Sequence, residues 1–216
     1  MNHNVNNKLI EDFIINHLYA EKIDTSAISP VVDSSSKDLA DSLISNPEFL
    51  ITENTSHQKI TDYINTLLPP KEQAEHQHLS LLLKDLSLAH QQEEIHTTYT
   101  LAEKIFVDYA DKLSFDNAIK ILLIFVENDL FNHLYDQSLV VLRGLHEFYP
   151  LLKIEEKKSF DFFIAQCLFH FGLQNNNRDH LYQAIIHSRH MLRYPNIEKD
   201  QLNIALFVII KSFEAL

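Results

Sequence analysis

The chain has 216 residues, which is enough for one large or two small domains, and it contains only two glycines and no tryptophan. Its 18 basic and 30 acidic side chains give a formal net charge of −12, which argues against free nucleic acid as a direct partner because phosphate neutralisation requires a basic face. The shortage of glycine excludes a glycine-rich phosphate cradle and favours helices.

The amino-terminal part is acidic and is expected to hold short helices. Apolar periodicity and helix-capping residues predict helices over residues 8–22, 37–45 and 58–68. Pro69-Pro70 then breaks the chain at the clearest internal boundary. We therefore divide the chain into an acidic segment, residues 1–68, and a helical-repeat domain, residues 69–216.

The second part is almost entirely helical by pattern. Its first helices are expected over residues 72–88, 91–113 and 115–129. Segments Phe115–Pro150 and Ser159–Pro195 then share one plan: an amphipathic helix, a polar turn, a second helix containing His-Leu-Tyr, and a stop at Tyr-Pro. The His-Leu-Tyr runs begin about 47 residues apart and the Tyr-Pro stops fall about 45 apart, a spacing typical of stacked helix pairs.

The apolar spacing also predicts which helices are central. Residues 160–171 carry apolar side chains on more than one side, which predicts an inner helix that ends at Gly172, with Asp179 capping the next helix. The last helix, residues 201–216, has an apolar stripe that predicts burial against a neighbour or a second subunit: Leu202, Ala205, Leu206, Ile209, Phe213 and Leu216. The expected fold is all-α, a right-handed superhelix of stacked antiparallel helix pairs, or TPR-like α-solenoid.

No catalytic or metal centre is expected from the sequence. The single cysteine, Cys167, lies on an apolar helix face and is interpreted as a buried structural thiol. His187 and His190 can share a helix face, but no third ligand stands near them in the sequence, so no metal is predicted. The chain is therefore expected to be no enzyme and to need no cofactor. Without a signal peptide or a membrane-spanning stretch, it is expected to be cytoplasmic.

The order of residue types in the second part resembles a known family. Asp116–Leu122, Asn132–Leu139, and Phe160–Leu173 with the asparagine-rich turn that follows it look like the carboxy-terminal helical-repeat domain of the Rgg (MutR, GadR) transcriptional regulators. The resemblance covers roughly residues 70–216. It implies a cytoplasmic receptor that dimerises, accepts a short signalling peptide on its concave face, and is coupled to an amino-terminal helix-turn-helix.

The amino-terminal segment departs from this family pattern. A basic DNA-binding domain begins the family's proteins, whereas residues 1–60 here are acidic. A weak helix-turn-helix pattern places the recognition helix at Lys37–Leu43. Asp38 and Asp41 on that helix would be repelled by the phosphates of DNA. Direct nucleic-acid binding is therefore not expected, and this segment is interpreted as a possible degenerate helix-turn-helix.

A peptide-binding groove needs side chains that bond the peptide backbone, and asparagine both donates and accepts. We expect Asn128, Asn132, Tyr135 and Arg143 to line a concave ligand-binding surface. Tyr135 and Tyr182 are interpreted as equivalent repeat positions that could present a hydroxyl to the groove or pack within the protein. The asparagines could instead serve turns and helix ends, where this residue is common.

Two functional hypotheses follow. In the first, the protein is a peptide-sensing or ligand-sensing regulator related to the Rgg type, acts as a homodimer, and lacks autonomous DNA binding. In the second, it is a helical-repeat scaffold that binds a partner protein through the same surface. Neither hypothesis involves a membrane.

Overall fold

The computed structural model describes residues 7–19 and 70–216, and every regular element in these two ranges is a helix. The expected all-α class is confirmed for these residues, which contain no strand. None of the helices in the described ranges is long and apolar enough to cross a membrane. The helices expected over 37–45 and 58–68, and the helix-turn-helix trace, lie outside the described residues.

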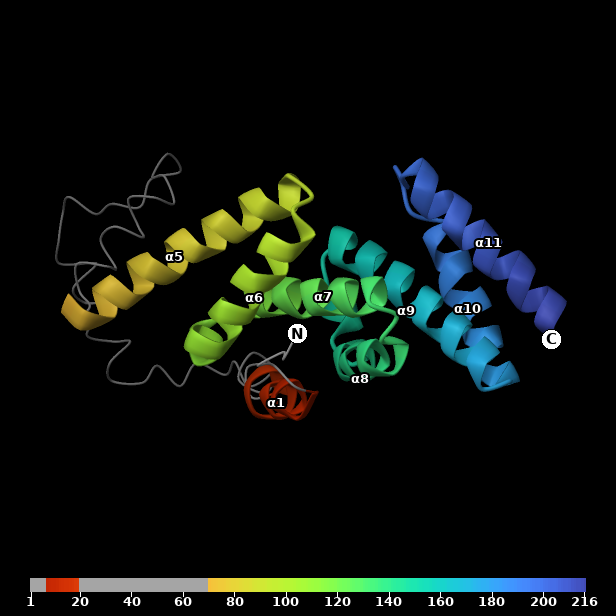
Figure 1. The fold of residues 1–216 in the computed structure, drawn as a ribbon, viewed down its shortest axis with the longest axis horizontal. Coiled ribbons are helices and arrows are strands. Elements are labelled where there is room, and N and C mark those ends of the chain that lie inside the picture. The colour runs from red at the N-terminus through yellow and green to blue at the C-terminus, as the bar shows by residue number, and fades with distance from the viewer. Residues whose placement is uncertain (1–6, 20–69) are drawn as a thin grey trace, which may run out of the picture.

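The helices from residue 70 onward follow one another from one end of the elongated molecule to the other, and the amino-terminal helix lies near the middle (Figure 1). The first element is α1 (Asn7–Phe13), which continues into a π-helical turn, η1 (Ile14–Leu18). The remaining helices are α5 (Pro70–Gln91), α6 (Ile95–Tyr109), α7 (Phe115–Phe131), α8 (Tyr135–His146), α9 (Ile154–Gln174), α10 (Arg178–Met191) and α11 (Lys199–Ala215). Short 3₁₀ turns, η3 (Ala110–Lys112) and η4 (Tyr149–Leu151), precede α7 and α9.

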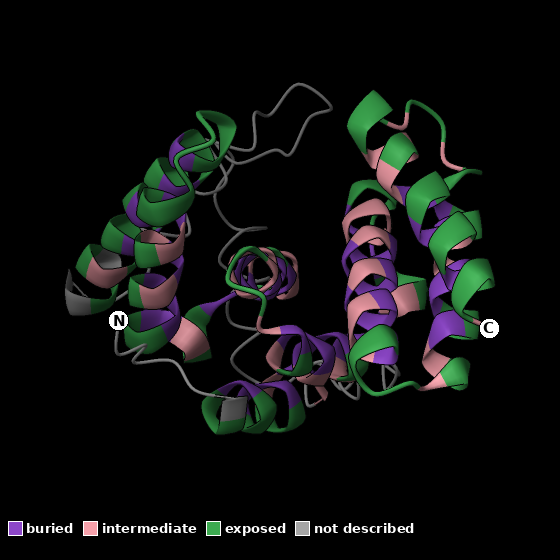
Figure 2. Cartoon of the chain, turned by 45° about the vertical axis from the view of Figure 1, so that its right-hand side comes forward, coloured by how far each residue is buried: buried purple, intermediate pink, exposed green. Residues whose placement is uncertain are grey.

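Each helix from α5 to α11 packs against the next one along the chain, and α9 also contacts α7 and α11. Buried residues lie along the sides of the helices that face their neighbours, and exposed residues lie on the outer sides (Figure 2). One hydrophobic core runs through these contacts, from Leu79 on α5 to Val208 on α11. Burial of this shared core is the main force that holds the hairpins together.

Three of the helix pairs, α5–α6, α7–α8 and α9–α10, are joined by the same turn. The second turn residue has a positive φ in each: 57° at Glu93, 61° at His133 and 50° at Asn176. The N–H of the third turn residue donates to the carbonyl five residues earlier, over 2.8 to 3.0 Å. This 6→1 bond with a left-handed residue is the Schellman arrangement that ends many helices. Residues 70–216 therefore contain three copies of one helical hairpin.

The first of these hairpins moves the break that was expected between the helices over 72–88 and 91–113. The turn Gln92–Glu94 lies within the second of these ranges, and the second helix begins only at Ile95. The turn contains no glycine, proline or asparagine, and its glutamine and glutamates favour helix. The turn residues therefore gave no local signal for the exact position of the break, which lies about three residues later than expected.

The repeat register based on His-Leu-Tyr is also wrong. His133 lies in the α7–α8 turn and Tyr135 is the first residue of α8, whereas His180 and Tyr182 lie inside α10. Alignment of the two turns pairs Tyr135 with Arg178, so the two tyrosines differ by about one helical turn. Their environments differ accordingly, since Tyr135 is buried and Tyr182 is exposed.

Helix α9 is the inner helix that the apolar spacing predicts. The predicted stripe is buried at these positions: Phe160, Phe163, Ile164, Cys167 and Leu168. Gly172 does not end the helix but lies within it, where Leu181 packs so closely that a Cβ would meet its Cδ2 at 3.0 Å. The left-handed residue is Asn176, and the cap of α10 is Asn177, whose side chain accepts from the His180 N–H, rather than Asp179.

The amino-terminal element joins the same core. α1 packs against α8, and Ile10, Phe13, Ile14 and Leu18 belong to the main hydrophobic cluster. The close approach occurs at Gly144, where a Cβ would lie 2.8 Å from Ile14 Cδ1. Residues 7–18 thus pack onto the repeat helices, while the proposed boundary at residues 68 and 69 stays a prediction.

The apolar stripe predicted for the last helix is rotated in the structure. α11 buries Ala205, Val208 and Ser212 against its neighbours. Its exposed large apolar side chains are Leu206, Phe207, Ile210 and Phe213. α11 is apolar on two sides, so periodicity alone could not show which side meets α10.

Candidate functional site

A buried carboxylate with three hydrogen-bond donors lies where two hairpins meet. Asp161, on the inner helix α9, has a relative exposure of 0%. Its Oδ2 accepts hydrogen bonds from the hydroxyls of Tyr149 at 2.7 Å and Tyr194 at 2.6 Å, and the two hydroxyls are 2.8 Å apart. Its Oδ1 accepts from His187 Nδ1 at 2.7 Å. Such complete pairing is what a buried charge requires.

The donors come from equivalent places in consecutive hairpins. Tyr149 begins the 3₁₀ turn after α8, and Tyr194 follows α10. Each is five residues before the next helix, and both belong to the predicted Tyr-Pro stops. The repeated tyrosine therefore does more than end a hairpin, because both copies bind the same carboxylate and join the ends of two repeats.

The hydrogen bonds set the acidity of these groups. Burial by itself would raise the pKa of Asp161, but the bonds from His187 and from the two tyrosine hydroxyls lower it, and the net pKa is below its ordinary value. Burial raises the pKa of Tyr149 to about 12, and burial with the nearby carboxylate raises the pKa of Tyr194 further. The site therefore holds an ionised carboxylate and neutral tyrosines at neutral pH.

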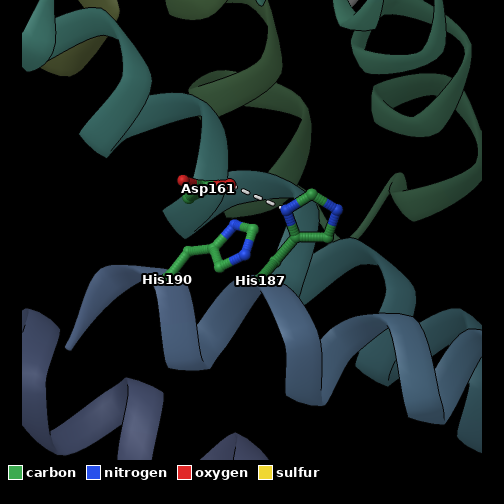
Figure 3. Close-up of side chains that lie close together, drawn as sticks. All are labelled: Asp161, His187 and His190. Atoms are coloured by element: carbon green, nitrogen blue, oxygen red, sulfur yellow. Dashed lines mark hydrogen bonds and ion pairs between the residues drawn. The ribbon is translucent and has the colours of Figure 1, made fainter. Parts of the chain in front are cut away.

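His190 completes a set of potential metal ligands. It lies one turn after His187 on α10, and both imidazoles extend from α10 toward the carboxylate on α9 (Figure 3). One ligand atom from each of His187, His190 and Asp161 can be chosen so that all three lie within 4.8 Å of one another. The sequence-based argument against a metal was the lack of a third ligand, and that argument is wrong because Asp161 supplies it.

This cluster was missed because its members are far apart in the chain. Tyr149 and Tyr194 are 45 residues apart, and His187 is 26 residues after Asp161. Asp161 stands between Phe160 and Phe162 in an otherwise apolar run. A charged residue inside an inner-helix pattern was the available signal, since a buried carboxylate needs partners.

The residues predicted to line a ligand surface come from the α7–α8 hairpin but have different roles. Asn132 Nδ2 donates to the Asn128 carbonyl at 2.8 Å, which closes the end of α7, as the alternative interpretation for asparagine expected. Asn128 Nδ2 is buried and has no hydrogen-bond partner. Arg143 is exposed on α8, two turns beyond Tyr135. The four residues stay a predicted ligand surface.

Tyr135 is held by two histidines. Its hydroxyl lies 2.8 Å from His133 Nδ1, and its ring stacks on His170 of α9 with centroids 4.5 Å apart and planes 12° apart. Burial raises the pKa of Tyr135 and lowers the pKa of His170. These contacts correspond to the packing alternative for this tyrosine, because the hydroxyl is already engaged within the hairpin.

Cys167 fits its interpretation as a structural thiol. The side chain is fully buried on α9, and burial raises its pKa to about 12. A thiol of that pKa is almost entirely protonated at neutral pH and is a poor nucleophile.

Comparison of the chain with models of known protein families, with curated proteins and with solved structures gave no significant match.

Proposed function

We propose that this protein is a helical-repeat binding protein that holds a peptide segment. The observation that carries the proposal is the hairpin that occurs three times with the same Schellman turn. Repeated hairpins that pack mainly on their neighbours bury a continuous core and leave an extended outer surface, which such proteins use for binding. In this proposal the hairpins form the right-handed, TPR-like superhelix expected from the sequence.

We favour a peptide-sensing regulator of the Rgg type as the specific form of this function. The α7–α8 hairpin offers exposed Asn132 and Arg143, whose side chains can bond a peptide backbone or its carboxylate. Because the net charge is −12, the proposal does not include direct binding of nucleic acid.

A scaffold that binds a partner protein is the second candidate. The exposed apolar side chains of α11 favour it, since a helix face with Leu206, Phe207, Ile210 and Phe213 in solvent is suited to contact with another polypeptide. The two candidates differ in the size of the bound molecule and in the surface used.

A random-peptide display library, selected against the full chain, tests the proposal. We expect enrichment of peptides that bind in the micromolar range and raise Tm, because a ligand of the folded state stabilises it. Arg143→Ala should weaken that binding by about tenfold, the effect of losing one charge-assisted contact. Affinities can be measured by isothermal titration calorimetry.

The matched control is Arg189→Ala, which removes a different exposed arginine, on α10, and should leave peptide affinity unchanged. Equal loss in both variants would indicate a general charge effect and would contradict the assigned surface. Absence of any enriched peptide would contradict the peptide-sensing form and favour the scaffold.

We propose that the expected homodimer forms through the exposed face of α11. Phe213 and Ile210 are 62% and 55% exposed and lie three residues apart, on one side of the helix. The double variant Ile210→Glu/Phe213→Glu should convert a dimer to a monomer, because it places two charges in an apolar contact, and it should leave Tm of the monomer nearly unchanged. Size-exclusion chromatography with light scattering measures the mass.

Leu81→Glu, on α5, is the control because Leu81 is 60% exposed on a distant helix. It should not alter the mass. A wild-type chain that is monomeric at high concentration, or a double variant that remains dimeric, would refute this interface.

A further inference from the structure

We propose that Asp161, His187 and His190 form a binding site for one Zn²⁺ ion at the junction of α9 and α10. The three residues converge from two helices, as Figure 3 shows, and a ligand atom from each lies within 4.8 Å of the others. This inference is independent of the proposed peptide binding, because it concerns a different hairpin and a different ligand.

The donor set determines the class of ion. Two imidazole nitrogens and one carboxylate oxygen suit Zn²⁺ and neighbouring transition metals, whereas Mg²⁺ and Ca²⁺ prefer oxygen ligands alone. Three protein ligands leave a fourth position of a tetrahedral ion for water or another small ligand. The site is therefore of the open kind rather than a closed structural one.

The carboxylate is already oriented as a ligand. Both tyrosine hydroxyls donate to Asp161 Oδ2, which leaves Oδ1 directed toward His187. Hydrogen bonds of this kind fix ligand orientation around many metal ions. Zn²⁺ would replace the proton between Asp161 Oδ1 and His187 Nδ1, and that proton would pass to solvent.

The site has an open side through which an ion can enter. The His187 side chain is 13% exposed, and His190 is on the surface of α10. Tetrahedral ligands at about 2.0 Å from Zn²⁺ lie about 3.3 Å apart, so a ligand atom at the 4.8 Å limit must approach by about 1.5 Å. Rotation of the exposed His190 side chain supplies that approach. Asp161 Oδ1 and His187 Nδ1 are 2.7 Å apart and must separate slightly, which the partly exposed His187 side chain permits.

Charge favours a cation at this point. The buried site contains one ionised carboxylate and two neutral tyrosines. A divalent ion would compensate the buried negative charge directly. Because the ion ties α9 to α10, its binding should also raise Tm.

The test is a titration of the full, tag-free chain with Zn²⁺ in competition with a chromogenic chelator, with Co²⁺ used in parallel for its tetrahedral absorption spectrum. We expect one ion per chain and a rise in Tm that a chelator reverses and Mg²⁺ does not produce. His190→Gln should weaken binding at least tenfold while the apo protein keeps its wild-type Tm, since His190 is exposed.

Two further variants make the result specific. His96→Gln, which removes another exposed histidine from α6, should bind Zn²⁺ as the wild type does. Tyr194→Phe, which removes one donor to Asp161 Oδ2, should weaken binding about tenfold through loss of ligand orientation. Absence of a one-to-one site, or a site whose affinity His190→Gln leaves unchanged, would overturn the proposal.

Discussion

Asp161→Ala is expected to lower the free energy of unfolding by about 3–5 kcal/mol, the cost typical of breaking a buried charged network. The variant leaves two tyrosine hydroxyls and the His187 Nδ1–H without their acceptor, and it opens a cavity under α10. A domain of this kind has a total stability of roughly 5–15 kcal/mol, so the loss is a large fraction of it. Urea unfolding followed by circular dichroism measures the change.

Asp108→Ala, at an exposed position of α6, is the control and should change stability by no more than about 0.5 kcal/mol. Tyr194→Phe should cost less than Asp161→Ala, about 1–2 kcal/mol, because the carboxylate keeps two donors. A loss below about 1 kcal/mol in Asp161→Ala would show that the network contributes little net stability.

The same network predicts how acid affects the protein. The pKa of Asp161 is lowered in the folded state, so the folded state binds its proton less readily than the unfolded state does. Its contribution to stability is therefore present above the ordinary carboxyl pKa of about 3.9 and is lost as the pH falls through the lowered folded-state pKa.

Asp129→Asn is expected to remove a loss of stability that the wild type shows as the pH rises, whereas the Asp161 contribution is lost as the pH falls. Burial, and then the charge of Asp136, raise the pKa of Asp129 to about 7 from 3.8. Between these two values the folded state holds a proton that the unfolded state has released, so stability falls as the pH rises through this window. From pH 5 to pH 8 this carboxyl should cost the wild type about 2 kcal/mol.

The neutral amide that replaces the Asp129 carboxyl should remove that dependence and make the variant more stable than the wild type at pH 8. His170, whose pKa is lowered by burial, contributes with the opposite sign below the ordinary histidine pKa of about 6.5, so the measured quantity is the difference in stability between variant and wild type at each pH. Asp136→Asn should reduce the effect in part, and Asp108→Asn should leave it intact. If the variant and the wild type differed in unfolding free energy by the same amount at pH 5 and at pH 8, the raised pKa of Asp129 would be contradicted.

The helical class and the place of α9 could be predicted because they depend on local periodicity. Apolar residues at helical spacing must share a face, and a helix with two apolar faces must lie inside. The buried stripe from Phe160 to Leu168 confirms this. The same reasoning was insufficient for α11, where two apolar sides compete and contact with α10 selects one of them.

The hairpin turns show that residue type alone does not always predict the position of a turn. Asn176 marks its turn clearly because asparagine tolerates a positive φ, but Glu93 adopts nearly the same φ with a side chain that favours helix. Its conformation is supported by a backbone hydrogen bond from the Glu94 N–H to the Ala89 carbonyl and by packing of α5 against α6. The third repeat was therefore visible only in the structure.

Composition and periodicity were enough to predict that the chain is acidic and that its described residues are helical, since these signals need no long-range contact. The meeting of Tyr149, Asp161, His187 and Tyr194 depends instead on how two hairpins stack, and no local pattern specifies it. A buried carboxylate needs partners, but the order of residues does not show which distant side chains they are. Stacking selects them, and the candidate metal site at His190 follows from that selection.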